Sequence, residues 1–244
     1  MAYVRKNPVN NRLLIIQEAA KMFMEEGYTK SSISKIAKKL NLSLGNITFH
    51  FKTKEHLLEV LVCDMFDYQQ MMMEECAEEG KSSLLAYCLE LTAITAVCEE
   101  SEVARDFYAS SYASALTLAR IRENDTKKVK DIFSKFHADW TDEQWIATEN
   151  IVSGIEYATI MTREENTPLP LQIEKTLDTI LYLFGVPKDL RKAKIEKVLS
   201  MDYRAIGHRL LKEFPAYVKK INKNNVKNFI QETQSTKKKG KHET

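Results

Sequence analysis

The residues best suited to contact another molecule lie in a short segment that begins after Ser43. Ile47 and Phe51 are four residues apart, a spacing that places two apolar side chains on one face of a helix. Asparagine can bond both polar atoms of an adenine edge, and glycine allows close approach to another molecule. The segment therefore predicts a short helix whose outer face contacts another molecule through small, polar and aromatic residues: Gly45, Asn46, Thr48, Phe49 and His50.

A second helix must position this segment. Ser32 is a good N-cap, and the residues that follow it repeat at helical spacing on one face: Ile33, Ile36, Ala37 and Leu40. Asn41 tolerates the left-handed conformation that a tight turn between helices requires, and Ser43 can cap the next helix. The pattern is that of a helix-turn-helix, in which the second helix enters the major groove of DNA.

At these residues the chain resembles the TetR family of bacterial transcriptional regulators. The resemblance covers residues 10–62 and consists of Ile36-Ala37, Leu42-Ser43, His50-Phe51 and Lys54-Glu55, with Leu57-Leu58 following. Two positions depart from the family pattern. The glycine common in the turn is Asn41, and the phosphate-contacting tyrosine is Thr48, with Phe49 as the neighbouring aromatic residue.

The resemblance and the helix-turn-helix pattern together assign roles to individual residues. Ser32 and Lys54, each at the start of a helix, are expected to bind backbone phosphates. Asn46 is the expected base reader, and Leu44 either touches a thymine methyl group or packs. The predicted DNA-binding residues are Ser32, Ser43, Leu44, Gly45, Asn46, Thr48, Phe49, His50 and Lys54.

Composition supports an all-α fold. The chain has 244 residues but only seven glycines and five prolines, which favours long helices over a turn-rich β fold. No apolar run approaches the ~20 residues of a membrane span, and the first residues lack the apolar core of a secretion signal. The four cysteines show no CxxC spacing, so we expect buried thiols, with a redox sensor as the alternative. These features predict a cytoplasmic protein.

Charge is unevenly distributed along the chain. Residues 1–60 carry 10 Lys and Arg against 5 Asp and Glu, whereas residues 61–185 carry 10 against 23. Residues 186–244 are basic again, with 16 against 6. This pattern indicates a DNA-facing end on an acidic body that DNA should avoid.

Helical patterns continue through most of the chain, and we find no convincing strand. Asn10 or Asn11 caps a first helix to about Glu26, and a long helix starts at Lys54 and runs to about Glu79. Further helices are predicted at 102–123, from a cap at Asp125, and at 141–165, 171–184 and within 188–231. The predicted domains are a three-helix DNA-binding domain (1–53), a larger helical-bundle regulatory and dimerisation domain (54–231, extended after 187) and a disordered basic tail (232–244).

For the larger domain the resemblance implies a ligand cavity and a dimer interface. The aromatic and soft residues predicted to line the cavity, each with ordinary core packing as its alternative, are Tyr87, Cys88, Phe107, Tyr108, Tyr112, Trp145, Tyr157 and Met161. The acidic balance of this region is compatible with a cationic effector or with a solvated acidic surface. The interface would come from helices 141–165 and 171–184, with apolar anchors at Ile151, Ile155, Leu177, Leu181 and Tyr182.

No catalytic or metal-binding pattern is found, and no cofactor is predicted. The five histidines are far apart, and there is no HExxH, P-loop or GxSxG motif. We therefore expect a homodimeric transcriptional regulator, most simply a repressor released from a palindromic operator by a small molecule. The alternatives are a DNA-binding regulator controlled by a protein partner, and an enzyme or scaffold on this fold. The segment after Pro187 is either a solvated helical appendage or an additional source of phosphate contacts.

Overall fold

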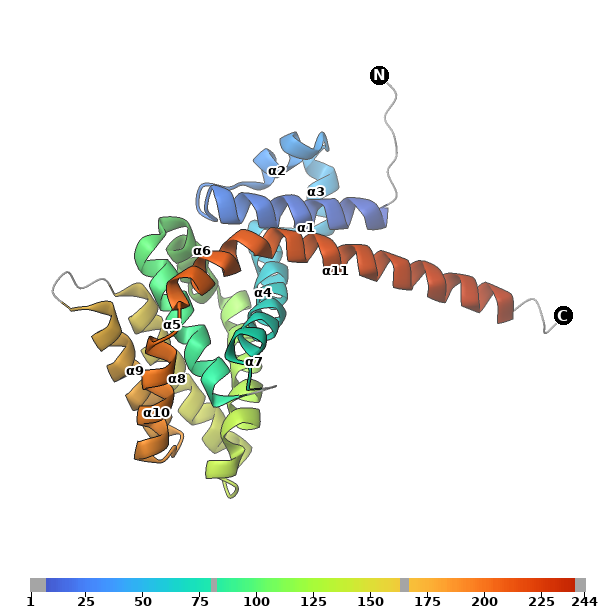
Figure 1. Ribbon diagram of the computed structural model, residues 1–244. Helices are drawn as coiled ribbons and strands as arrows, with labels where there is room; N and C mark the ends of the chain where they lie inside the picture. Colours follow the sequence, from blue (N-terminus) through green and yellow to red (C-terminus); the bar gives the residue numbers. More distant parts are fainter. Residues whose placement is uncertain (1–7, 80–82, 163–166, 240–244) are drawn as a thin grey trace.

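The computed structural model of the chain consists of α-helices and one short 3-10 helix (Figure 1). It describes the backbone of residues 8–79, 83–162 and 167–239, and the side chains of 11–79, 83–162 and 167–223. No strand occurs in these ranges. The predicted all-α class is confirmed.

The three N-terminal helices form a small unit at one end of the molecule (Figure 1). α1 spans Pro8–Glu25, α2 spans Ile33–Leu40 and α3 spans Leu44–His50. The predicted cap of α1 at Asn10 or Asn11 was wrong, because the helix begins at Pro8 and both asparagines lie inside it; proline is favoured in the first turn of a helix. The caps predicted for α2 and α3 are confirmed: the Ser32 and Ser43 hydroxyls accept from the backbone N–H groups of Lys35 and Asn46.

The next four helices lead from this unit into the body. α4 spans Lys54–Ala77 and α5 spans Leu84–Glu100, and nearly every side chain of α5 is buried. α6 covers Glu102–Ala113 and α7 covers Ala115–Phe133, followed by the short helix η1 at Ser134–Phe136. The prediction of one helix at 102–123 and a new cap at Asp125 was wrong. The helix is interrupted at Ser114, between α6 and α7. Asp125 lies inside α7 and lines a cavity between neighbouring helices instead of capping a helix.

α8 (Asp142–Met161) and α9 (Leu169–Leu183) follow, then α10 (Lys188–Leu199). The capping signature at Thr141 is confirmed, with the Thr141 hydroxyl accepting from the Gln144 N–H and the Gln144 side chain returning to the Thr141 N–H. Residues 163–166, within the predicted helix 141–165, lie outside the described part of the chain. Two of the four thiols, Cys88 and Cys98, are buried and Cys63 is exposed.

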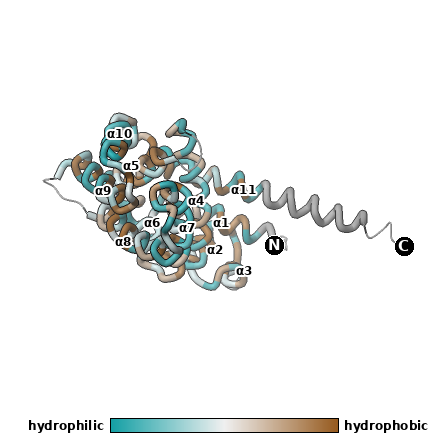
Figure 2. Tube along the Cα trace, turned by 90° about the horizontal axis from the view of Figure 1, so that it is seen from below, coloured by the Kyte–Doolittle hydropathy of each residue, from teal (hydrophilic) through white to brown (hydrophobic). Residues whose placement is uncertain are grey.

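The long last helix, α11 (Tyr203–Lys239), ties the two ends of the chain together. It packs against α5, α1 and α4, and both views show it running beside α1 (Figures 1 and 2). The Tyr68 ring of α4 lies 4.7 Å from that of Tyr217 and 6.1 Å from that of Phe214. Pro215 lies within the helix rather than at an end. This part of α11 is packed into the fold, not a solvated appendage.

One continuous apolar core runs from the N-terminal unit into the body. The predicted domain boundary after residue 53 coincides with the start of α4 and stays a prediction. The sequence predicted a disordered tail for 232–244, whereas α11 continues to Lys239, through glutamine, glutamate and lysine residues that favour helix. Residues 240–244 lie outside the described part.

Candidate nucleic-acid interface and ligand cavity

α3 has one buried face and one exposed face. Ile47 is fully buried and Phe51 nearly so, which fixes the short helix to the unit. Leu44 is 52% exposed and Phe49 is 79% exposed, and Thr48 is exposed beside them. A phenyl ring left this open gains little from folding. The outer face of α3 is therefore available to contact another molecule.

Asn46 is half-buried, and its orientation is set by the first helix. The Asn11 amide nitrogen donates to the Asn46 Oδ1 at 3.3 Å, which leaves the two N–H groups of Asn46 to donate elsewhere. The sequence analysis considered Asn11 only as a cap and missed this contact, although its position one turn before Ile15 on the buried face of α1 could have indicated it. Gly45 is open, since an added Cβ would meet only the Ser43 hydroxyl, at 4.0 Å.

His50 lies at the end of α3, next to Phe49. Their rings meet edge to face with centroids 5.0 Å apart. Burial, and secondarily the charge of Arg12, lowers the pKa of His50. The imidazole is therefore neutral at pH 7 and can both accept and donate a hydrogen bond.

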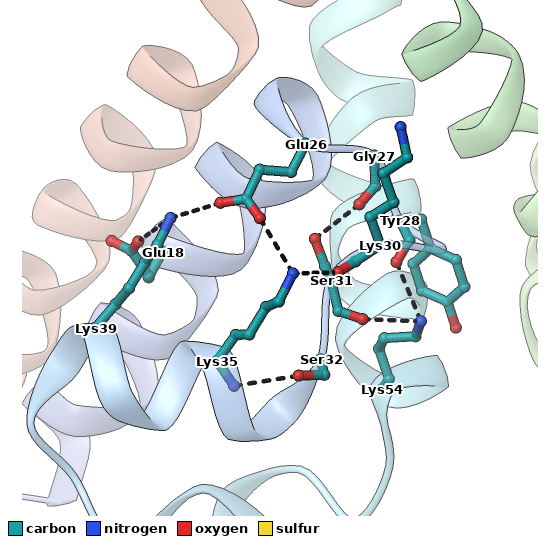
Figure 3. A network of polar contacts seen from close by, with 10 residues as sticks. All are labelled: Glu18, Glu26, Gly27, Tyr28, Lys30, Ser31, Ser32, Lys35, Lys39 and Lys54. Atoms are coloured by element: carbon teal, nitrogen blue, oxygen red, sulfur yellow. Dashed lines mark hydrogen bonds and ion pairs between the residues drawn. The ribbon is translucent and has the colours of Figure 1, made fainter.

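Lys54, a predicted phosphate ligand, has contacts inside the unit (Figure 3). Its ammonium donates to the carbonyls of Tyr28 and Ser31 at 3.1 and 3.2 Å and lies 3.9 Å from the centre of the Tyr28 ring. These contacts fasten the turn between α1 and α2 to the start of α4. An ammonium has three N–H groups, so one remains for a phosphate.

Two lysines of α2 are paired with carboxylates (Figure 3). The Lys39 ammonium lies 2.8 Å from the Glu26 carboxylate and 3.7 Å from that of Glu18, and Lys35 lies 3.6 Å from Glu26. The hydrogen bond from Lys39 lowers the pKa of Glu26. Exposed pairs of this kind add little stability, but they hold α2 against the end of α1 and reduce its free positive charge.

The larger domain contains a cavity of about 70 Å³ between α4, α5, α6, α7 and α8. Four of the eight residues predicted for it line it: Tyr87, Phe107, Tyr108 and Tyr112. The other four do not. Cys88 and Trp145 are buried elsewhere in the core, Met161 packs at the edge of that core, and Tyr157 is 41% exposed, with its ring 5.2 Å from that of Tyr112.

The sequence analysis missed the charged residues of this cavity: Glu90, Asp125, Lys128, Glu149 and Glu156. A signal for two of them was present in α8. Glu149 and Glu156 stand on the same helical stripe as the buried residues Trp145, Val152 and Ile160, where a carboxylate is unusual.

The predicted dimer interface stays a prediction, and its five anchors differ in exposure. Leu177 and Leu181 are fully buried within the subunit. Ile151 and Tyr182 are 60% and 65% exposed, and Ile155 is half-buried. Around Ile151, the exposed stripe of α8 otherwise consists of small residues: Ala147, Gly154 and Ala158.

None of the described helices contains an apolar stretch of the length that a membrane span requires. Within the same ranges, no three His, Cys, Asp or Glu residues are grouped so that they could hold a metal ion.

The capped α2, the left-handed residue at Asn41 and the exposed face of α3 define a helix-turn-helix unit attached to a larger helical body. Residues 15–61 match the family described as bacterial regulatory proteins, tetR family. The N-terminal unit of the chain is therefore a TetR-family helix-turn-helix, as the sequence predicted. The curated relatives described below are named as helix-turn-helix transcriptional regulators.

Two curated relatives and one solved structure illustrate the similarity. The uncharacterized HTH-type transcriptional regulator YuxN of Bacillus subtilis (strain 168) is 28% identical over 52% of this chain and 43% of its own length. The match thus spans less than half of that relative. An HTH-type transcriptional regulator of Staphylococcus aureus (strain MRSA252) is 27% identical over 56% of this chain and 78% of its own. A solved gamma-butyrolactone receptor (ArpA-like protein) is 18% identical, covers 85% of this chain and 100% of its own, and has a TM-score of 0.42.

Proposed function

We propose that this protein is a homodimeric transcriptional repressor that binds a palindromic DNA operator and is released from it by a small molecule. The observation that carries the proposal is the exposed outer face of α3, with Phe49 79% exposed on a helix fixed by two buried anchors. In this arrangement α3 enters the major groove, Asn46 donates to a base edge and Phe49 lies against a thymine methyl group.

Replacing Phe49 by alanine tests this assignment. We expect operator affinity to fall roughly tenfold to a hundredfold, because one good base contact is worth about 1–3 kcal/mol, while the melting temperature stays unchanged. The operator is first selected from random duplexes with the wild-type protein, and affinities are measured at fixed salt.

Met71→Ala is the matched control, because Met71 is also a large apolar residue, 47% exposed, but lies on α4 away from α3. It should leave the affinity unchanged. Equal affinities of the Phe49 variant and the wild type would remove α3 as the reading helix.

A second copy of the chain supplies the second reading helix. One seven-residue helix contacts few base pairs, whereas a two-fold dimer reads two half-sites separated by whole turns of DNA. The face proposed for this contact is the exposed side of α8 and α9. It combines the small residues of α8 with two exposed apolar side chains, Ile151 and Tyr182.

The cavity supports a small-molecule effector rather than a protein partner, and α6 connects it to the DNA-binding unit. Phe107, Tyr108 and Tyr112 of α6 line the cavity. The preceding residue, Asp106, accepts from the backbone N–H of Thr29 at 2.7 Å and from the Thr29 hydroxyl. A shift of α6 on ligand binding would therefore move the turn between α1 and α2.

Replacing Asp106 by alanine should weaken this coupling. The protein should still bind its operator, but the ligand that releases the wild type should change the operator affinity several-fold less, since a typical allosteric coupling is about 1–3 kcal/mol. The measurement is the ratio of operator affinities with and without ligand. If that ratio is the same in the variant and the wild type, Asp106 does not transmit the signal.

A further inference from the structure

The walls of the cavity combine aromatic rings with an excess of carboxylates. Tyr87, Phe107, Tyr108 and Tyr112 provide the rings. Four carboxylates line the same space, Glu90 from α5, Asp125 from α7, and Glu149 and Glu156 from α8, against the single ammonium of Lys128. The remaining lining is mostly apolar, so the carboxylates lie in a site with little solvent.

Three of these carboxylates have partners within the protein. Glu90 pairs with Lys128. The Tyr87 hydroxyl donates to Glu156 at 2.7 Å, and the Asn124 amide donates to Asp125 at 3.1 Å. The lysine is thus already used, and the group as a whole keeps unbalanced negative charge.

Glu149 is the exception. It is only 1% exposed, it lines the cavity, and its Oε2 atom has no hydrogen-bond partner among the described residues. A buried carboxylate oxygen without a donor costs free energy, and native proteins rarely leave one unless a ligand completes it. In its ionised form Glu149 can only accept, so a group that binds this form must be a donor.

The electrostatics of the cavity favour a cation as its ligand. Burial, and secondarily the charge of Asp125, raises the pKa of Glu149 to about 7 and raises that of Glu156. Burial also raises the pKa of Asp125, although Lys128 opposes it, while Arg122 opposes the shift of Glu149. Burial therefore favours the protonated forms of these carboxylates, and a cation beside them would favour the ionised forms.

We propose that this cavity binds a small organic amine in its protonated form. The ammonium group of the ligand donates to Glu149, and its apolar part lies against the tyrosine and phenylalanine rings. The proposal rests on the proposed function, in which a ligand of the larger domain releases DNA, and gives that ligand a chemical class. An aromatic face also attracts a cation directly, which adds to the pairing.

A matched series of three probes tests the charge preference without DNA. Phenethylammonium, phenethyl alcohol and hydrocinnamate share a benzene ring and a short chain but carry a positive, a neutral and a negative group. In calorimetric titrations of the full chain, phenethylammonium should bind at least about tenfold more tightly than the alcohol, since a hydrogen bond to a charged group is the stronger kind. Hydrocinnamate should not bind. Equal binding of the alcohol, or no binding of the ammonium ion, overturns the proposal.

Variants assign the preference to the site. Glu149→Gln keeps the shape but removes the charge, and should reduce the advantage of phenethylammonium over the alcohol to about twofold or less. Glu156→Gln is the second variant and should reduce it partially. Glu196→Gln removes the same charge from the exposed surface of α10 and should change nothing. A full advantage retained in Glu149→Gln contradicts the assignment.

Proton release gives an independent readout. Because Glu149 is partly protonated near neutral pH, the affinity for phenethylammonium should rise between pH 6 and pH 8, with protons released to the buffer on binding. A separate operator-binding assay keeps the two proposals apart. Binding of the amine with no effect on the DNA complex would support the site and contradict ligand-controlled release.

Discussion

Replacing Gly154 by arginine is expected to convert the protein to a monomer without harming the subunit. Gly154 lies on the exposed face of α8, and an added Cβ would meet no atom within 4 Å among the described residues. Within one subunit the change should even stabilise the helix, by about 0.5–1 kcal/mol, because glycine is a poor helix former. In the proposed dimer, the long charged side chain would stand where two helices must approach closely.

The expected measurements are a change from dimer to monomer in analytical ultracentrifugation and a loss of operator affinity of roughly a hundredfold or more. Operator affinity falls because two linked reading helices bind DNA far more tightly than one. Gly154→Ala is the matched control and should remain dimeric. A Gly154→Arg protein that sediments as a dimer would show that this face is not the interface.

Replacing Gly207 by valine should destabilise the whole protein. Gly207 lies where α11 crosses α5, and an added Cβ would be 2.5 Å from the Ala93 carbonyl oxygen and 3.0 Å from the Val97 Cβ. The first neighbour is backbone, so the two helices must separate. Overpacking of this kind costs about 1–3 kcal/mol, which exceeds the gain in helix propensity from replacing glycine.

For a chain of this size, we expect the melting temperature to fall by roughly 2–12 °C, measured by calorimetry or circular dichroism. Gly45→Val is the control, because the nearest atom to an added Cβ there is 4.0 Å away, on an exposed helix. That variant should melt at or slightly above the wild-type temperature. Similar melting temperatures for the Gly207 variant and the wild type would mean that α11 does not contact α5 this closely.

Local signals in the sequence predicted the helix-turn-helix well. The roles of Ser32, Asn41 and Ser43 follow from the sequence, because their hydrogen bonds and backbone preferences involve neighbouring residues only. The same holds for Thr141 at the start of α8. Asp125 shows the limit of this reasoning. Aspartate is a favoured cap, but here the packing of α7 against α4 and α8 outweighs that preference and keeps the helix continuous.

Features that depend on distant residues were not predictable in the same way. Leu177 and Leu181 are apolar whether they face a partner or their own core, and only the position of α8 decides between the two. The cavity carboxylates come from three helices, so their common location appears only in the fold. The aromatic residues were partly predictable, since Tyr87 and Phe107 lie on stripes that must face inward.

The packing of α11 on α1 also bears on the order in which the protein folds during synthesis. Domains generally fold as units, with the N-terminal one first as the chain leaves the ribosome. Here the first helix reaches its full packing only after the last one, nearly two hundred residues later, has been made. Contacts between such distant segments form slowly, because a long loop must close first. The nascent DNA-binding unit should therefore remain incompletely packed until α11 has been synthesised, which would delay its competence to bind DNA.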